Sequence, residues 1–216
     1  LSDSLTRLYA ASTVESPYRP DAEGAGKRAL NARVLSMITR MDGGKTAQKQ
    51  FEHADNMSQQ LAALNALLAQ GHGQDASEAF FTQWQGDRLV MDKWFAAQVA
   101  FSEPESAADV AQRLTTHPLF DMKNPNRFRA VFGALAMNHA GFHHISGKGY
   151  TLLADWLIKL DAINPQTAAR MCTAFQTWAR YGATHSDLAK AQLARILATD
   201  GLSRDTEEMV SRILEG

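Results

Sequence analysis

Two of the seven histidines in this sequence lie four positions apart, so they are the first residues to test for chemistry. His139 and His143 would share one face of a helix, as zinc-binding helices require. However, no Glu follows His139, Gly141 interrupts the segment, and no carboxylate lies at a fitting distance downstream. The H-E-x-x-H motif occurs nowhere in the chain. We therefore predict that both histidines lie in a connection between helices and bind no metal.

The sequence also lacks the residues of a nucleophilic or phosphate-binding site. The single cysteine, Cys172, falls within a predicted helix, where a buried structural thiol is the better interpretation. There is no G-x-S-x-G motif, and the glycines at 24–26 and 147–149 match neither a P-loop nor a dinucleotide fingerprint. We expect no cofactor in this chain and no catalysis from it alone.

Two predicted helices begin with the same dipeptide. Asn124-Pro125 and Asn164-Pro165 each place Asn at the N-cap and Pro at the first helical position, where the missing N–H costs no hydrogen bond. The two starts are roughly 40 residues apart with one predicted helix between them, the length of a HEAT or armadillo-like repeat. This spacing favours a helical solenoid and leaves a compact helical bundle as the alternative.

Arginines follow these helix starts. Arg127 and Arg129 lie in the first turns of one helix, and Arg170 lies near the second turn of the other. A cation near a helix N-terminus opposes the helix dipole by about 0.3–1 kcal/mol at exposed sites, which indicates a compensating acid or a bound anion. Spacing alone favours pairing with protein carboxylates such as Asp121 or Asp161. The alternative is a site for a ligand's carboxylate.

The elements that position these residues are all helical. Strand signals are nearly absent, and apolar residues recur at helical spacing in segments that Gly or Pro closes. Thr13–Pro20, with two prolines, is predicted to be a loop. The predicted helices are Ser4–Ala11, Gly24–Met41, Met57–Leu68, Ala76–Trp84, Val90–Phe101, Ala107–Thr115, Asn124–Met137, Gly149–Ile163, Asn164–Tyr181, Asp187–Ala198 and Ser203–Leu214. We predict an all-α fold, a right-handed superhelix of antiparallel helix pairs like a HEAT or armadillo solenoid.

Composition limits the partners. The 22 Lys and Arg residues nearly balance the 23 Asp and Glu residues, so no basic field indicates nucleic acid or an anionic membrane as a partner. No apolar run reaches the ~18 residues of a membrane span. A single cysteine fits a reducing compartment, so we expect a cytoplasmic location. Because the sequence opens at Leu1 inside a helical pattern, we expect a fragment of a longer polypeptide.

Several sequence blocks, from about residue 24 to the end, form a specific combination. They are HADNMSQQLAALNALL (53–68), LVMDKWFAAQ (89–98), HPLFDMKNPNRFRAVFGA (117–134), FH (142–143), GKGYTLLADWLIKLDAINPQTAAR (147–170) and GLSRDTEEMVSRIL (201–214). Together they resemble the C-terminal domain of bacterial aminopeptidase N, of the gluzincin family of zinc aminopeptidases. D-K-W-F with N-P-N-R-x-R and N-P-Q-x-A-x-R is the most specific part of this resemblance.

The resemblance implies a division of labour between domains. The whole enzyme would remove N-terminal amino acids from peptides with zinc held in a thermolysin-like domain, whose H-E-x-x-H and G-x-M-E-N motifs are absent here. This chain would be a non-catalytic superhelical domain that closes over that catalytic domain and admits only small peptides. Its implied partners are the catalytic domain of the same polypeptide and peptide substrates.

The resemblance also assigns roles to residues. Arg129, Gln166 and Arg170 match positions that face the substrate chamber, which makes contact with the C-terminal side of a peptide, including its carboxylate, the favoured role. The segment 136–141 departs from the family pattern, so His139 inherits no role. We expect residues 1–22 to form a junction with a preceding domain, as a helix plus a linker, and residues 23–216 to form the C-terminal helical-repeat domain. The alternative is an autonomous helical-repeat scaffold that binds a protein partner.

Overall fold

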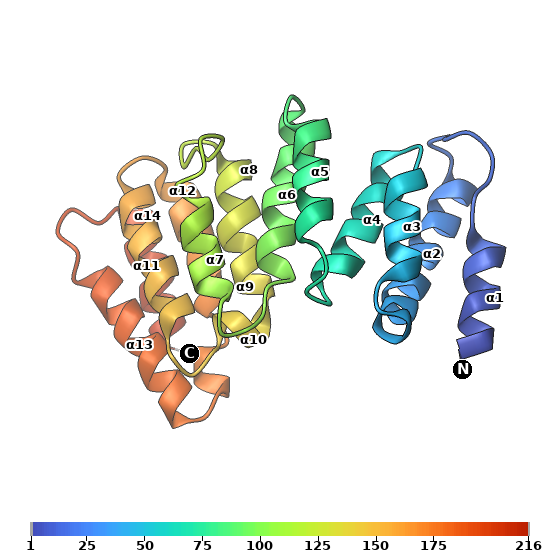
Figure 1. Ribbon diagram of the computed structural model, residues 1–216. Helices are drawn as coiled ribbons and strands as arrows, with labels where there is room; N and C mark the ends of the chain where they lie inside the picture. Colours follow the sequence, from blue (N-terminus) through green and yellow to red (C-terminus); the bar gives the residue numbers. More distant parts are fainter. Residues whose placement is uncertain (1, 216) are drawn as a thin grey trace. The chain divides into compact units, whose positions relative to one another are not determined.

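A computed structural model of the chain describes residues 2–215 and has only helices as regular elements within that range (Figure 1). The all-α prediction is therefore confirmed. Two compact units make up the chain, Leu1–Trp94 and Phe95–Gly216, and the boundary falls within one helix, α6. Of the helices that the structure describes, none is both long and apolar enough to cross a bilayer.

The first unit consists of helices that pack on their neighbours in sequence. α1 packs against α2, and α4 packs against both α2 and α3. The amide of Asn31, which is buried on α2, donates to the carbonyl of Tyr9 at 3.1 Å and so fastens α1 to α2. The elements are α1 (Ser2–Ser12), α2 (Ala22–Asp42), α3 (Lys45–His53), α4 (Met57–Leu68), α5 (Gln74–Trp84) and the start of α6 (Arg88–Ala100).

Helix α3 is absent from the sequence prediction. Gly43 and Gly44 end α2, which the sequence predicts to stop at Met41, and α3 begins immediately after them. Their φ angles of 66° and 88° favour glycine. Ala47 and Phe51 are the only two residues that α3 buries. A stripe of two apolar residues is too short to stand out as helical periodicity, so the helix escapes detection from sequence.

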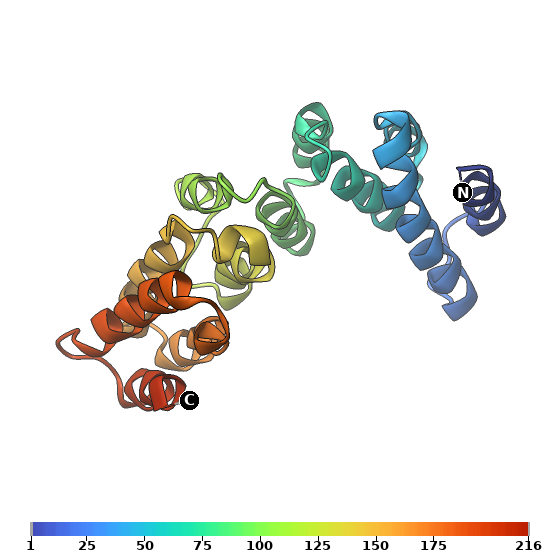
Figure 2. The same cartoon turned by 90° about the horizontal axis from the view of Figure 1, so that it is seen from below.

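The second unit surrounds an aromatic core. α11 packs against α12 and α13, and α12 packs against α14. Figure 2 shows these helices from below. Fully buried aromatic side chains, Phe128, Phe132, Phe142, Tyr150 and Phe175, fill the centre. Its elements after α6 are α7 (Ala107–Leu114), α8 (Pro125–Phe128), the π-helix η1 (Arg129–Gly133), α9 (Ala134–Met137), α10 (His139–Phe142), α11 (Lys148–Asp161), α12 (Pro165–Cys172), the 3₁₀ turns η2 (Thr173–Phe175) and η3 (Trp178–Arg180), α13 (Ala183–Leu197) and α14 (Arg204–Glu215).

Two predicted helices are divided in the structure. The predicted helix 124–137 is α8, the π-helix η1 and α9 in succession, and the predicted helix 164–181 leaves the α-helical path after Cys172. In the second case the indole N–H of Trp178 donates to the carbonyl of Ile213 on α14 at 2.8 Å. This contact joins residues distant in sequence, so helical periodicity could not indicate the tighter turns.

Candidate functional site

Both Asn-Pro dipeptides start helices as the sequence predicts. The side-chain oxygen of Asn124 accepts a hydrogen bond from the backbone N–H of Asn126 at 3.0 Å, and Pro125 is the first residue of α8. Asn164 caps α12 in the same way, through the backbone N–H of Thr167 at 3.0 Å. Each cap satisfies an amide that the helix itself leaves unpaired. The two caps therefore fix the first turn of α8 and of α12, and with it the positions of the residues that follow.

Arg129 begins the π-helix η1 and has an exposed side chain. Its Nε–H donates to the carbonyl of Pro125 at 3.0 Å, and its Nη2 donates to the side-chain oxygen of Asn126 at 2.9 Å. Insertions of π-helix into α-helices are rare and frequently occur at functional sites. No sequence motif assigns a role to Asn126, although its position three residues before Arg129 places both on one helix face.

Arg127 has a different environment from Arg129. Its side chain is only 4% exposed, it lies over the ring of Phe95 at 4.6 Å, and its Nη1 donates to the carbonyl of Leu119. A guanidinium stacked on an aromatic face and bonded to backbone holds neighbouring segments together. Arg127 is thus a core residue of the second unit, whereas Arg129 faces solvent.

Gln166 and Arg170 lie together on the outer face of α12. They are four residues apart and both are exposed, while Ala168 and Ala169 between them are buried. Within residues 2–215 no hydrogen bond or ion pair joins either of them to Arg129. The structure therefore brings two of the three predicted site residues onto one surface and places the third on a different helix.

Asp121 and Asp161, the two carboxylates named as possible partners, pair with neither Arg129 nor Arg170 among the described residues. Asp121 accepts a hydrogen bond from the backbone N–H of Lys123 at 2.9 Å. Asp161 is buried at the end of α11 and accepts from the backbone and hydroxyl of Ser203 and from the hydroxyl of Thr206. The first arrangement satisfies a local turn, and the second joins the end of α11 to the start of α14. Among the described residues, Arg129 and Arg170 have no acidic partner.

His143 belongs to a cluster of aromatic rings with Tyr150 and Tyr181. The Nδ1 atom of His143 lies 2.7 Å from the hydroxyl of Tyr150, and its ring stacks on Tyr181 with a centroid distance of 4.1 Å. Burial, with the neighbouring His139 and His185, lowers the pKa of His143 to about 4. His139 begins one turn of helix, α10, which the sequence prediction treated as a plain connection. In the part of the chain that the structure describes, no three His, Cys, Asp or Glu residues could hold a metal ion together.

Cys172 is completely buried on α12, as predicted for a structural thiol. Burial is the main cause that raises the pKa of this thiol to about 12, and Asp161 adds to the effect. A thiol with such a high pKa forms almost no thiolate near neutral pH, and the thiolate is the nucleophilic form. Cys172 therefore has neither the access nor the ionisation that nucleophilic catalysis requires.

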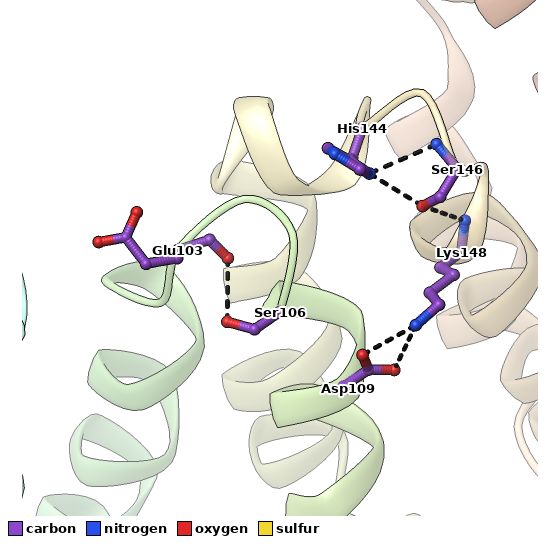
Figure 3. Close-up of polar contacts among 6 residues, drawn as sticks. All are labelled: Glu103, Ser106, Asp109, His144, Ser146 and Lys148. Carbon is purple, nitrogen blue, oxygen red and sulfur yellow. Dashed lines mark hydrogen bonds and ion pairs between the residues drawn. The ribbon is translucent and has the colours of Figure 1, made fainter.

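A polar cluster joins α7 to the start of α11 (Figure 3). The ammonium of Lys148 lies 2.9 Å from the carboxylate of Asp109, and Nδ1 of His144 lies 2.9 Å from the hydroxyl of Ser146. Among residues 2–215, no carboxylate is hydrogen-bonded to His144, so the Ser–His pair lacks the third group of a catalytic triad. An exposed ion pair of this kind contributes about 0–1 kcal/mol to stability. The cluster thus connects α7 to α11.

A cavity of about 720 Å³ lies within the first unit and contains none of the predicted site residues. The loop after α1 and the helix α3 line it. Its lining combines the cations Lys45 and Lys49 with the anions Glu15 and Asp55. This mixture of charges selects no particular class of ligand, so the exposed arginines of the second unit remain the better candidates.

This chain is similar to a known protein family and to known aminopeptidases. A family model described as a domain of unknown function, DUF3458_C, with ARM repeats matches residues 1–215. Aminopeptidase N of Caulobacter vibrioides is 38% identical over 220 residues, which cover 99% of this chain and 25% of that protein. Aminopeptidase N of Escherichia coli is 35% identical over 223 residues, which cover 99% of this chain and 25% of that protein. This chain therefore spans about a quarter of the length of these relatives.

A solved structure has the same fold. The crystal structure of Legionella pneumophila aminopeptidase A in complex with aspartic acid matches with a TM-score of 0.86 and 28% identity. The match covers 99% of this chain and 26% of that one. The sequence resemblance to the C-terminal domain of bacterial aminopeptidase N is confirmed, and the ARM repeats agree with the predicted armadillo-like helical pairs.

Proposed function

We propose that this chain is a non-catalytic domain of an aminopeptidase N-like zinc metallopeptidase. The proposal starts from the family: the chain belongs to the DUF3458_C family of ARM-repeat domains. In this proposal it closes over the active-site chamber, limits entry to small peptides and contacts the peptide beyond the scissile bond. The partners are the catalytic domain of the same polypeptide and the peptide itself. We place the enzyme in the cytoplasm.

The zinc ion belongs to the catalytic domain in this proposal. The described residues of this chain offer no group of three metal ligands, and the sequence has no H-E-x-x-H motif. A zinc ion bound in the catalytic domain would supply a Lewis acid for the scissile carbonyl and for the attacking water. This chain's own residues would bind and orient the far end of the peptide.

One observation carries the binding role, namely that Arg129 and Arg170 are exposed and have no acidic partner within the described residues. Arginine binds a carboxylate through two parallel N–H groups, and such charge-assisted hydrogen bonds are stronger than neutral ones. Gln166 lies on the same face of α12 as Arg170 and offers an amide to the peptide backbone. These three residues would anchor the C-terminal side of a substrate.

Anchoring at a distance from the reaction acts through position. Binding energy from a remote part of a substrate raises turnover only when it places the scissile bond better in the transition state. Longer peptides reach the anchor, whereas an amino-acid anilide has no residue beyond the scissile bond. We therefore expect the anchoring residues to affect peptides more strongly than anilides.

The test uses the full-length enzyme with Arg170→Ala. Losing a charge-assisted hydrogen bond costs about 1.5–3 kcal/mol, so kcat/KM for a tetrapeptide should fall by about 10- to 150-fold. The loss for an amino-acid anilide should be much smaller. Arg180→Ala, which removes another exposed arginine of the second unit, is the matched control. Equal losses for the tetrapeptide and the anilide would contradict the anchoring role.

A second test uses this chain by itself. We expect no hydrolysis of an amino-acid anilide and no stoichiometric zinc in the purified chain. Stoichiometric zinc that disappears when His139 and His143 are both replaced would instead indicate a metal site at these histidines. Turnover that survives their replacement would contradict the non-catalytic role.

A further inference from the structure

We propose that Asn126 is a positioning residue that holds the guanidinium of Arg129 in the orientation required to bind the C-terminal carboxylate of a peptide. This inference rests on the function proposed above. It concerns the orientation of the Arg129 side chain, and it gives a role to Asn126, which would not itself touch the substrate.

The two hydrogen bonds of Arg129 occupy one edge of its guanidinium. The Nε–H donates to the carbonyl of Pro125 at 3.0 Å, and an adjacent Nη2–H donates to the side-chain oxygen of Asn126 at 2.9 Å. Within residues 2–215, both Nη1–H groups and the second Nη2–H of Arg129 make no hydrogen bond. These terminal groups form the other two-pronged edge, whose geometry matches a carboxylate. The bonds thus fix the plane of Arg129 and leave its outer edge for a ligand.

The turn that supplies the two acceptors is itself fixed. Asn124 caps it through the backbone N–H of Asn126, and the backbone N–H of Phe128 donates to the carbonyl of Asn124 at 2.9 Å. Phe128 is completely buried and Arg127 is 4% exposed, so one face of the turn is held in the core of the second unit. The acceptors therefore belong to a rigid element, as a preorganised site requires.

The side chain of Asn126 contacts Arg129 through a hydrogen bond and is not part of the core. It is exposed, and within residues 2–215 its only side-chain hydrogen bond is the one to Arg129. Replacing it should therefore leave the fold intact. Without this acceptor, Arg129 regains rotational freedom, which binding must then remove. Immobilising one flexible side chain corresponds to a change in affinity of about 2- to 12-fold.

The experiment is a double-mutant cycle in the full-length enzyme with Asn126→Ala, Arg129→Ala and the double variant. We would measure KM and kcat for a tetrapeptide with a free carboxylate and for the same peptide with a C-terminal amide. We expect Asn126→Ala to raise KM for the free acid by about 3- to 10-fold relative to the amide, with a smaller change in kcat. In the Arg129→Ala background, the same replacement should have no further effect.

Three outcomes would overturn the inference. Asn126→Ala could leave the acid-to-amide ratio of KM unchanged while Arg129→Ala alters it, and the binding role of Arg129 would then stand without a positioning residue. The effect of Asn126→Ala could persist in the Arg129→Ala background, which would make its effect independent of the guanidinium. Arg129→Ala itself could leave the ratio unchanged. Arg170→Ala would then show separately whether the proposed function survives.

Discussion

Replacing Asp161 by Ala tests how the second unit holds its last helix. Asp161 ends α11, is 4% exposed, and accepts three hydrogen bonds from the start of α14. These come from the backbone N–H of Ser203 at 2.7 Å, the hydroxyl of Ser203 at 2.5 Å and the hydroxyl of Thr206 at 2.6 Å. Because a single carboxylate serves all three donors, its removal should loosen α14 from α11 and α12.

The magnitude follows from the donors left behind. Thr206 is completely buried, and each buried donor without an acceptor costs about 1–3 kcal/mol. Relief from the cost of burying the carboxylate offsets part of this loss. We therefore expect the free energy of unfolding to fall by about 3 kcal/mol. For a chain of this size, that corresponds to a decrease in Tm of about 6–12 °C.

Urea denaturation and thermal unfolding of this chain, followed by circular dichroism, measure the effect. Asp155→Ala is the matched control, since Asp155 lies on the same helix and pairs with Arg195 at 2.6 Å on a half-exposed surface. This control should cost less than about 1 kcal/mol. If Asp161→Ala is as stable as the wild-type chain, or if both variants lose the same amount, the anchoring role of Asp161 is wrong.

The other predictions concern His143, Cys172 and Gly149. His143 should titrate in an NMR experiment with a pKa of about 4, below its ordinary 6.5. Between pH 4 and pH 6.5 the unfolded state binds more protons at His143 than the folded state does. The contribution of neutral His143 to stability is therefore complete above pH 6.5 and is lost as the pH falls toward 4. A midpoint near 6.5 would refute the partial burial of this ring. Cys172 should resist a thiol reagent at pH 8 until denaturant is added, and rapid labelling of the native chain would contradict its burial. Gly149→Ala should lower the free energy of unfolding by about 1–3 kcal/mol, because its Cβ would lie 2.6 Å from the carbonyl oxygen of Phe142. Gly182→Ala, with open space around its Cβ, is the control, and equal stability of the two variants would contradict the close approach of α11 to α10.

Local interactions explain why much of the fold could be predicted. The helix caps at Asn124 and Asn164 and the helix end at Gly43 depend only on residues within one helical turn. The local sequence therefore contains all the residues needed to predict them. Long apolar stripes similarly identified most helices. Helix α3, with Ala47 and Phe51 as its two buried residues, has too weak a stripe to be found in this way.

The sequence by itself determined the helical class, the main helix starts and the motif that identifies the family. It also supplied Arg129, Gln166 and Arg170 as candidates, whose role in binding stays a prediction. Tertiary structure decided which arginines are accessible: Arg127 packs on Phe95, while Arg129, two residues later, faces solvent. The two differ because a rotation of about 200° along a helix turns one side chain into the core and the other outward, and only the position of the neighbouring helices sets where the core lies.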